Sequence, residues 1–113
     1  MYSIVSTAII HGIQSVPISV EADVSDGMPV FEMVGFLASE VQEAKERVRT
    51  ALKNCGYALT PKHITINFTP ANIRKSGSGF DLPVAVAVLT AFGYVRQELV
   101  GEYFVTGEVG LNG

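Results

Sequence analysis

Residues 16–25 read VPISVEADVS, and from Ile18 onward they alternate apolar and polar side chains without a break. The apolar set is Ile18, Val20, Ala22 and Val24, and the polar set is Ser19, Glu21, Asp23 and Ser25. Successive side chains of a β-strand point to opposite faces, so this pattern predicts a strand with one buried face. A strand of this kind needs neighbours in a sheet and a second layer over its apolar side.

Four other segments favour strands by their β-branched and aromatic residues and their bounding turns. They are residues 3–10 (SIVSTAII), 29–34 (PVFEMV), 63–68 (HITINF) and 102–109 (EYFVTGEV). His11-Gly12 and Asp26-Gly27 are typical turn dipeptides and predict the connections of the first three strands.

An amphipathic helix is predicted from Ser39 to Cys55, because apolar residues recur there at intervals of three and four. Ser39 and Gln42 have the spacing of a capping box, and Gly56 supplies the stop. The opposite side of the helix carries a cationic row, and Glu43 is placed to pair with Arg47. The row consists of Lys45, Arg49 and Lys53.

A second helix is predicted from Asp81 to Gly93, with Asp81 as its cap and Pro83 in its first turn. Its interior is apolar nearly all round, so we expect it to be the most buried element. The order of elements predicts an α+β fold, in which a mixed β-sheet has two main helices packed on it, on one face.

The chain of 113 residues fits a single domain, and a hydrophobic content of 48% suits a globular core. The longest apolar run, Leu82–Val95, is shorter than the roughly 20 residues of a membrane-spanning helix. Because Cys55 is the one cysteine and the chain opens without a basic signal-peptide region, we expect a cytoplasmic protein.

The net charge of −3 argues against a polycationic nucleic-acid binder, but the charges are unevenly placed. Seven of the eight basic residues lie between Lys45 and Lys75. This block is compatible with a solvated helix held by salt bridges and with an anion-binding face.

The loop of residues 74–83, RKSGSGFDLP, concentrates the candidate chemistry. It is neither a Walker A loop, because its cations precede the glycines, nor a G-x-G-x-x-G motif. A weaker anion site at the start of the second helix remains open, helped by Arg74 and Lys75. Ser76 and Ser78 are candidate nucleophiles, for which the base would be Lys75, His11 or His63. One cysteine and two distant histidines give no metal-ligand cluster.

Four segments together resemble the N-terminal domain of the ComM/YifB group, bacterial Mg-chelatase-like AAA+ ATPases. They are VEADVSDGMPVFEMVGF, EAKERVRTALKNCGY, ITINFTPANIRKSGSGFDLPVAVAVL and TGEVGLNG, in order along essentially the whole chain. The resemblance implies a fold like the Lon proteolytic domain, in the ribosomal-protein-S5-domain-2-like class, and a related domain ends the RadA recombination ATPases.

The resemblance also implies that residues 1–113 form one Lon-like N-terminal domain, truncated at its C-terminal edge. A AAA+ domain that binds ATP and Mg²⁺ is expected downstream, with no cofactor in residues 1–113. Proteins of this group are associated with DNA branch migration as hexamers during natural transformation. The implied partners are therefore further copies of the chain and DNA, with no membrane.

In Lon-type domains the corresponding loop reads roughly K-D-G-P-S-A-G, with the serine as nucleophile and a downstream lysine as base. Matching Lys75 and Gly77 to that loop puts Gly79 at the nucleophile's position and Ser78 one residue early. The lysine of the dyad would fall beyond Gly113. The resemblance therefore implies a protease-like scaffold without proteolysis.

The sequence thus predicts a non-catalytic accessory domain that aids oligomer assembly and DNA engagement. The alternatives are a Lon-like Ser-Lys peptidase that uses Ser78, and a stand-alone interaction module. The candidate DNA- or partner-binding residues are Arg74, Lys75, Ser76, Ser78, Lys45, Arg49 and Lys53.

Overall fold

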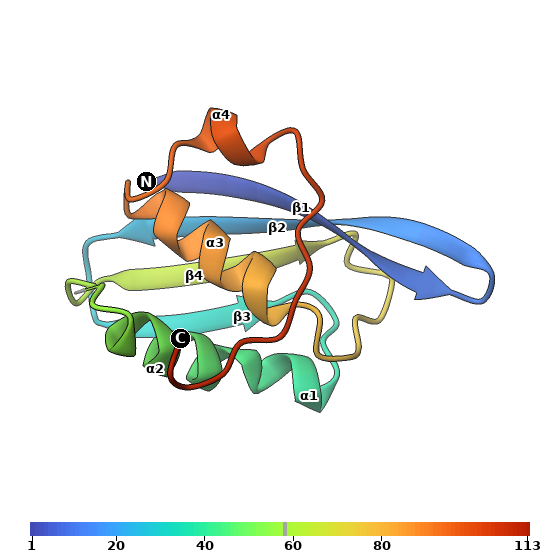
Figure 1. The fold of residues 1–113 in the computed structure, drawn as a ribbon, viewed down its shortest axis with the longest axis horizontal. Helices are drawn as coiled ribbons and strands as arrows, with labels where there is room; N and C mark the ends of the chain where they lie inside the picture. The colour runs from blue at the N-terminus through green and yellow to red at the C-terminus, as the bar shows by residue number, and fades with distance from the viewer. Residues whose placement is uncertain (58) are drawn as a thin grey trace.

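Four strands form one mixed sheet in the order β1-β2-β4-β3 (Figure 1). The structure is a computed structural model that describes residues 1–57 and 59–113, with only the backbone of His11. The strands are β1 (Tyr2–His11), β2 (Gln14–Ser25), β3 (Val30–Val34) and β4 (His63–Thr69). β2 pairs antiparallel with both β1 and β4, and β3 pairs parallel with β4. The predicted mixed sheet and its first four strands are confirmed.

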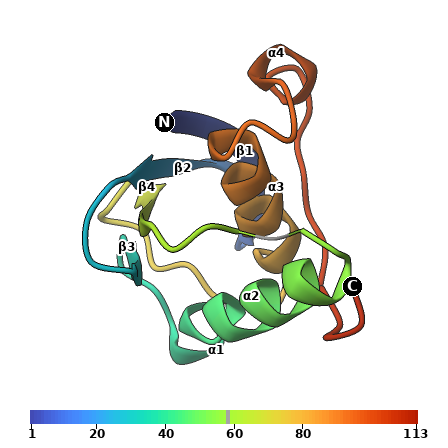
Figure 2. The ribbon, with the colours of Figure 1, turned by 90° about the vertical axis from the view of Figure 1, so that its left-hand side faces the viewer.

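The alternation in the sequence corresponds to a buried inner face and a polar outer face of the sheet. Ile18 and Val20 of β2 and Ile66 and Phe68 of β4 are buried on the inner face. The outer face is polar and carries Glu21, which accepts hydrogen bonds from Tyr2 Oη at 2.7 Å and Asn67 Nδ2 at 2.9 Å. The helices lie on the inner face alone, so a single layer covers the core (Figure 2).

The first predicted helix forms as two segments, α1 (Ser39–Gln42) and α2 (Ala44–Asn54), which meet at Glu43. The predicted capping box is wrong. Ala38 occupies the cap position without a side-chain bond, and Gln42 Nε2 donates instead to the carbonyl of Leu37 at 3.2 Å. The entry to α1 is held by backbone, since Ala38 N donates to the carbonyl of Lys75 at 2.9 Å.

The second predicted helix is α3 (Asp81–Ala91), and it is the most buried helix, as expected. Gly93, with φ of +90°, follows its end. The assignment of Asp81 as its cap is wrong, because Phe80 holds that position and the Asp81 carboxylate is turned toward α2. No helix in the described part of the chain is both long and apolar enough to cross a membrane.

Past α3 the chain departs from the prediction. A short helix that the sequence pattern did not indicate, α4 (Gln97–Val100), lies beside β1 (Figure 1). Its Gln97 side chain pairs with the backbone of Ile4, accepting from the N–H at 2.9 Å and donating to the carbonyl at 2.8 Å. The outer edge of β1 is thereby closed at Ile4.

The strand predicted over residues 102–109 is wrong. Phe104 makes one parallel bridge to Ser6, and Val105 N donates to the Ser6 carbonyl at 2.9 Å. After this single contact the chain leaves the sheet edge, because residues 106–109 pair with the start of α3 instead of with β1.

Candidate functional site

The loop of residues 74–81 is fixed by backbone bonds to the turn that follows β3. Lys75 N donates to the carbonyl of Phe36 at 3.0 Å, and the Lys75 carbonyl accepts from Ala38 N. The loop therefore lies against the segment that leads from β3 into α1, where one extra bridge joins Leu37 and Lys75.

Lys75 is directed into the protein, and its side chain is 0% exposed. Its Nζ donates to the carbonyl of Gly35 at 2.7 Å and also to the carbonyl of Pro70. Burial lowers the pKa of this amine, because the charged form is the one that loses hydration. The prediction that Lys75 contacts DNA or a partner therefore needs correction, since the ammonium joins two turns inside the domain.

The turn that receives Lys75 has little freedom. Gly35 has φ of +125°, and a Cβ there would lie 2.9 Å from Cβ of Phe68 and closer still to the Phe68 carbonyl. Phe36 follows with φ of +61°, an uncommon conformation for a non-glycine residue, and its side chain is exposed. The sequence analysis did not predict that these two residues form a strained turn. A glycine directly after a predicted strand was the available signal.

Asp81, 1% exposed at the start of α3, is neutralised by a cation from α2. Arg47 donates two hydrogen bonds to it, from Nε to Oδ2 at 2.7 Å and from Nη2 to Oδ1 at 2.8 Å. The hydrogen bond to Asp81 is the main cause that raises the pKa of Arg47. The predicted Glu43–Arg47 pair forms as well, at 3.7 Å, but it is the more exposed one.

Residues 105–109, which we call the strap, tie the C-terminal part of the chain to the same region. Gly107 N donates to the carbonyl of Gly79 and Leu82 N donates to the carbonyl of Gly107, both at 3.0 Å. Val109 N donates to Asp81 Oδ2 at 3.2 Å. A Cβ at Gly79, the position matched to the Lon nucleophile, would lie 2.8 Å from Oγ1 of Thr106. The strap therefore occupies the space beside that position.

The predicted anion site at the start of α3 is not supported, because two of its donors already have partners and the buried Asp81 carboxylate lies there. Gly77 N faces the Glu40 carboxylate at 3.4 Å, and Leu82 N is held by the strap. Of the loop's polar side chains, Arg74, Ser76 and Ser78 are exposed.

The candidate nucleophiles have no partner base in the part of the chain that the structure describes. Neither Ser76 nor Ser78 donates a hydrogen bond there, and the Lys75 amine is engaged elsewhere. His63 lies at the start of β4 with its Nε2 3.3 Å from Glu32 Oε2. Among the described residues, no three His, Cys, Asp or Glu side chains gather as metal ligands do.

The cationic row runs along α2 away from the loop, from Lys45 in the first turn to Lys53 in the last. The loop after β4 is beside α1, whereas the end of α2 reaches the start of β4 (Figure 1). The structure therefore does not extend the loop's surface along the row to Lys53. Arg49 lies over the ring of Phe31, 5.7 Å from its centroid, and 4.0 Å from Glu46.

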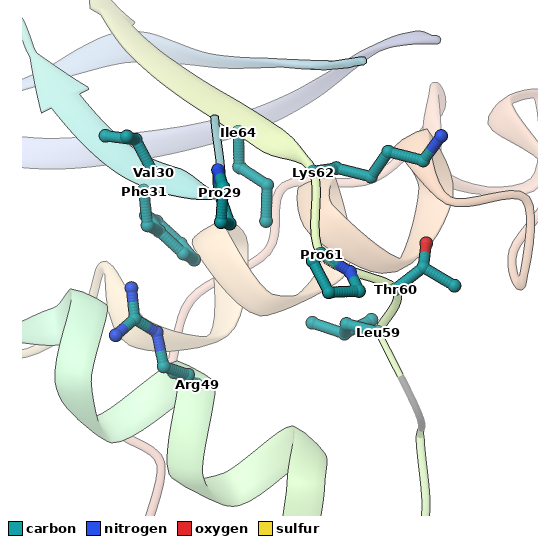
Figure 3. Close-up of a pocket in the computed structure, with 9 residues that line it drawn as sticks. All are labelled: Pro29, Val30, Phe31, Arg49, Leu59, Thr60, Pro61, Lys62 and Ile64. Carbon is teal, nitrogen blue, oxygen red and sulfur yellow. The ribbon is translucent and has the colours of Figure 1, made fainter. Parts of the chain in front are cut away.

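Two adjoining hollows open beside Arg49. One, of about 270 Å³, lies between α2 and the starts of β3 and β4, with Phe31, Leu59, Pro61 and Ile64 in its lining (Figure 3). The other, of about 380 Å³, is lined by Arg49, Thr50, Lys53, Tyr57 and Leu59. Sequence reasoning found the cations and missed the apolar lining, because that lining combines the start of β3 with the loop after α2, which come together only in the fold.

Comparison with known proteins places the chain in a family. Residues 20–113 match the family described as subunit ChlI of Mg-chelatase, and the chain belongs to that family. The resemblance inferred from the sequence is thereby confirmed.

Individual relatives agree with the assignment. The chain is 42% identical to YifB of Escherichia coli over 111 residues, which cover 98% of the chain and 22% of that relative. It is 38% identical to the competence protein ComM of Haemophilus influenzae over 104 residues, which cover 87% of the chain and 20% of that relative. The chain thus spans about a fifth of the length of these relatives.

Proposed function

We propose that this chain is a non-catalytic accessory domain of a bacterial Mg-chelatase-like AAA+ ATPase, in which it aids oligomer assembly and DNA engagement. ATP and Mg²⁺ belong to a motor domain outside these residues. Membership of the ChlI family supports the link to such a motor, and the name of the Haemophilus relative supports a role in competence.

The loop of residues 74–81 is the observation that carries the proposal. Three of its groups have structural partners. Lys75 holds two turns together, the Gly79 carbonyl binds the strap, and Asp81 binds Arg47. A catalytic loop needs groups that are free to contact a substrate, whereas these three groups of the loop make bonds within the domain.

The rival peptidase hypothesis requires Ser78 to be activated by a base. Ser78 is exposed, and the nearest lysine in sequence, Lys75, points away into the core. We therefore expect a fluorophosphonate probe to leave the chain unlabelled. Labelling that disappears in Ser78→Ala would revive the peptidase.

DNA engagement would use Arg74 of the loop, a cation that remains at the surface. Cations of this kind bind phosphates without reading sequence, so they supply affinity that falls with salt. Because the net charge is acidic, one copy contributes little to the affinity for DNA. Several copies around one DNA would add their contacts and raise that affinity.

The experiment compares the full-length ATPase with a form that lacks residues 1–113. We expect the shortened protein to assemble less completely with ATP and Mg²⁺, as measured by light scattering, and to bind DNA more weakly. Unchanged assembly together with unchanged DNA binding would overturn the proposal.

A further inference from the structure

The two hollows beside Arg49 form one continuous feature, which we call the α2 groove. They share Arg49 and Leu59, so they meet along the exposed side of α2. Apolar side chains line much of the groove, and Arg49 and Lys53 supply positive charge. Of their volumes, about 270 Å³ is just below the range of roughly 300–1,000 Å³ for small-molecule sites, and about 380 Å³ is at its lower end. Side chains of a protein partner suit hollows of this size.

Nucleobases suit the groove less well, because its aromatic faces are occupied. Phe31 is buried beneath Arg49, and Tyr57 meets Tyr94 edge to face, with centroids 5.0 Å apart. Single-stranded nucleic acid is bound by aromatic rings whose faces are open to successive bases. The groove therefore favours a partner that combines negative charge with protruding apolar side chains.

The chain itself carries a surface of that composition, in residues 98–104, which we call the α4 knob. It presents Leu99, Tyr103 and Phe104 at 53%, 64% and 68% exposure. The knob also carries two exposed acids, Glu98 and Glu102, of which Glu98 lies 3.9 Å from Arg96 Nε. Exposed aromatic side chains next to one another are typical of interaction surfaces.

The knob and the groove lie on opposite sides of the molecule. Figures 1 and 2 show α4 above β1, at one edge of the sheet, and α2 below, next to β3 at the other edge. A knob so placed is turned away from the groove of its own chain, so a knob that enters the groove belongs to a different molecule.

We propose that the α2 groove binds the α4 knob of a second copy of this chain. Tyr103 and Phe104 enter the two hollows, and Glu98 and Glu102 face Arg49 and Lys53. The inference rests on the proposed role in assembly and names the surfaces that carry it. Because the contact joins two different surfaces, copies add head to tail, which gives a closed ring when the rotation closes and a filament when it does not.

Charge reversal on each side provides the test. The groove variant is Arg49→Glu/Lys53→Glu and the knob variant is Glu98→Lys/Glu102→Lys. Lys45→Glu makes the same kind of change on α2 outside both hollows and serves as the matched control. Sedimentation velocity is measured on the 113-residue chain at up to about 1 mM, a concentration that detects even a weak contact.

We expect wild-type chain and Lys45→Glu to self-associate, and each reversed variant to associate at least tenfold more weakly. Mixing the two variants pairs the acidic groove of one with the basic knob of the other, and the basic groove with the acidic knob, so the mixture should associate again. A chain with all four charges reversed also restores complementarity and should associate too. Lys53→Glu alone, which leaves Arg49 on Phe31, repeats the test without disturbing that packing.

Several outcomes would overturn the inference. They are a wild-type chain that stays monomeric at about 1 mM, a reversed variant that associates normally, and failure of the four-charge chain to recover. A groove variant that loses DNA binding and keeps self-association would assign the groove to DNA instead. If deletion of residues 1–113 impairs the full-length ATPase while the reversed variants assemble normally, the proposed function stands and this interface is wrong.

Discussion

Arg47 and Asp81 join α2 to the first turn of α3 through two hydrogen bonds of 2.7 and 2.8 Å. The aspartate is almost fully buried, while the arginine keeps part of its side chain in solvent. Their link makes the helix layer one unit, since the same carboxylate also accepts Val109 N from the strap.

Arg47→Met is expected to destabilise the domain by about 3 kcal/mol, because it leaves a buried carboxylate without its cation. Arg47→Met/Asp81→Leu should recover part of that loss, since it removes both charges. Urea unfolding measures both. A double variant less stable than Arg47→Met would contradict this account.

Lys75→Met is expected to cost about 2 kcal/mol near neutral pH, because two carbonyls lose their donor. Its pH dependence is the sharper test. Burial lowers the pKa of Lys75 in the folded state from the usual 10.5, so just below 10.5 the unfolded chain binds more protons. Stability due to this group therefore rises as the pH climbs through the folded-state pKa toward 10.5.

The measurement is the difference in unfolding free energy between wild type and Lys75→Met from pH 7 to 11. Tyr2, whose pKa is raised by its hydrogen bond to Glu21, acts with the opposite sign but is common to both proteins and cancels. A difference that stays flat, or that falls with pH, would show that Lys75 is not buried as a cation.

Gly35→Ala is expected to destabilise the domain by about 3 kcal/mol, the upper end for a strained backbone, because the added Cβ meets the backbone of Phe68 as well. Gly12→Ala is the control. It also has positive φ, of +66°, but no atom lies within 4 Å of its added Cβ. In thermal unfolding, Gly35→Ala should have the clearly lower melting temperature. Equal decreases for the two variants would mean that the positive φ alone, and not the contact with Phe68, causes the destabilisation.

Arg74→Ala is expected to weaken DNA binding and to lower the salt slope of log K by about one, as removal of one phosphate contact does. Arg96→Ala, an equally exposed arginine outside the loop, should leave both unchanged. Fluorescence anisotropy with the full-length ATPase at several salt concentrations checks this. If Arg96→Ala has the larger effect, the loop is not the DNA contact.

Periodicity was sufficient to predict the sheet and both main helices, because each of those patterns lies within one segment. The side-chain roles that were wrong depend on partners distant in sequence. Asp81 looks like a cap until Arg47 is placed beside it, and Ser39 looks like a cap until the Lys75 carbonyl takes over the entry to α1.

The candidate site shows the same limit. From the sequence, the neighbouring cations Arg74 and Lys75 look equally suited to bind a partner. In the fold, the bridge between Leu37 and Lys75 directs Lys75 into the core and leaves Arg74 outside. Residues 102–109 have strand-like composition, but Gly107 packs on Leu82 and draws the chain away from β1. The helix α4 is four residues long, which is too short to show a helical repeat of apolar residues in the sequence.

The closure of the β1 edge by Gln97 and Val105 has a consequence for synthesis on the ribosome. β1 and β2 can form their hairpin as soon as residue 25 has emerged, but the residues that cover the β1 edge are made about eighty residues later. At rates of about 5–20 residues per second, that edge stays open for several seconds. Nascent chains on neighbouring ribosomes are then at risk of pairing through β1, so slow translation over residues 26–97 is a hazard for this domain.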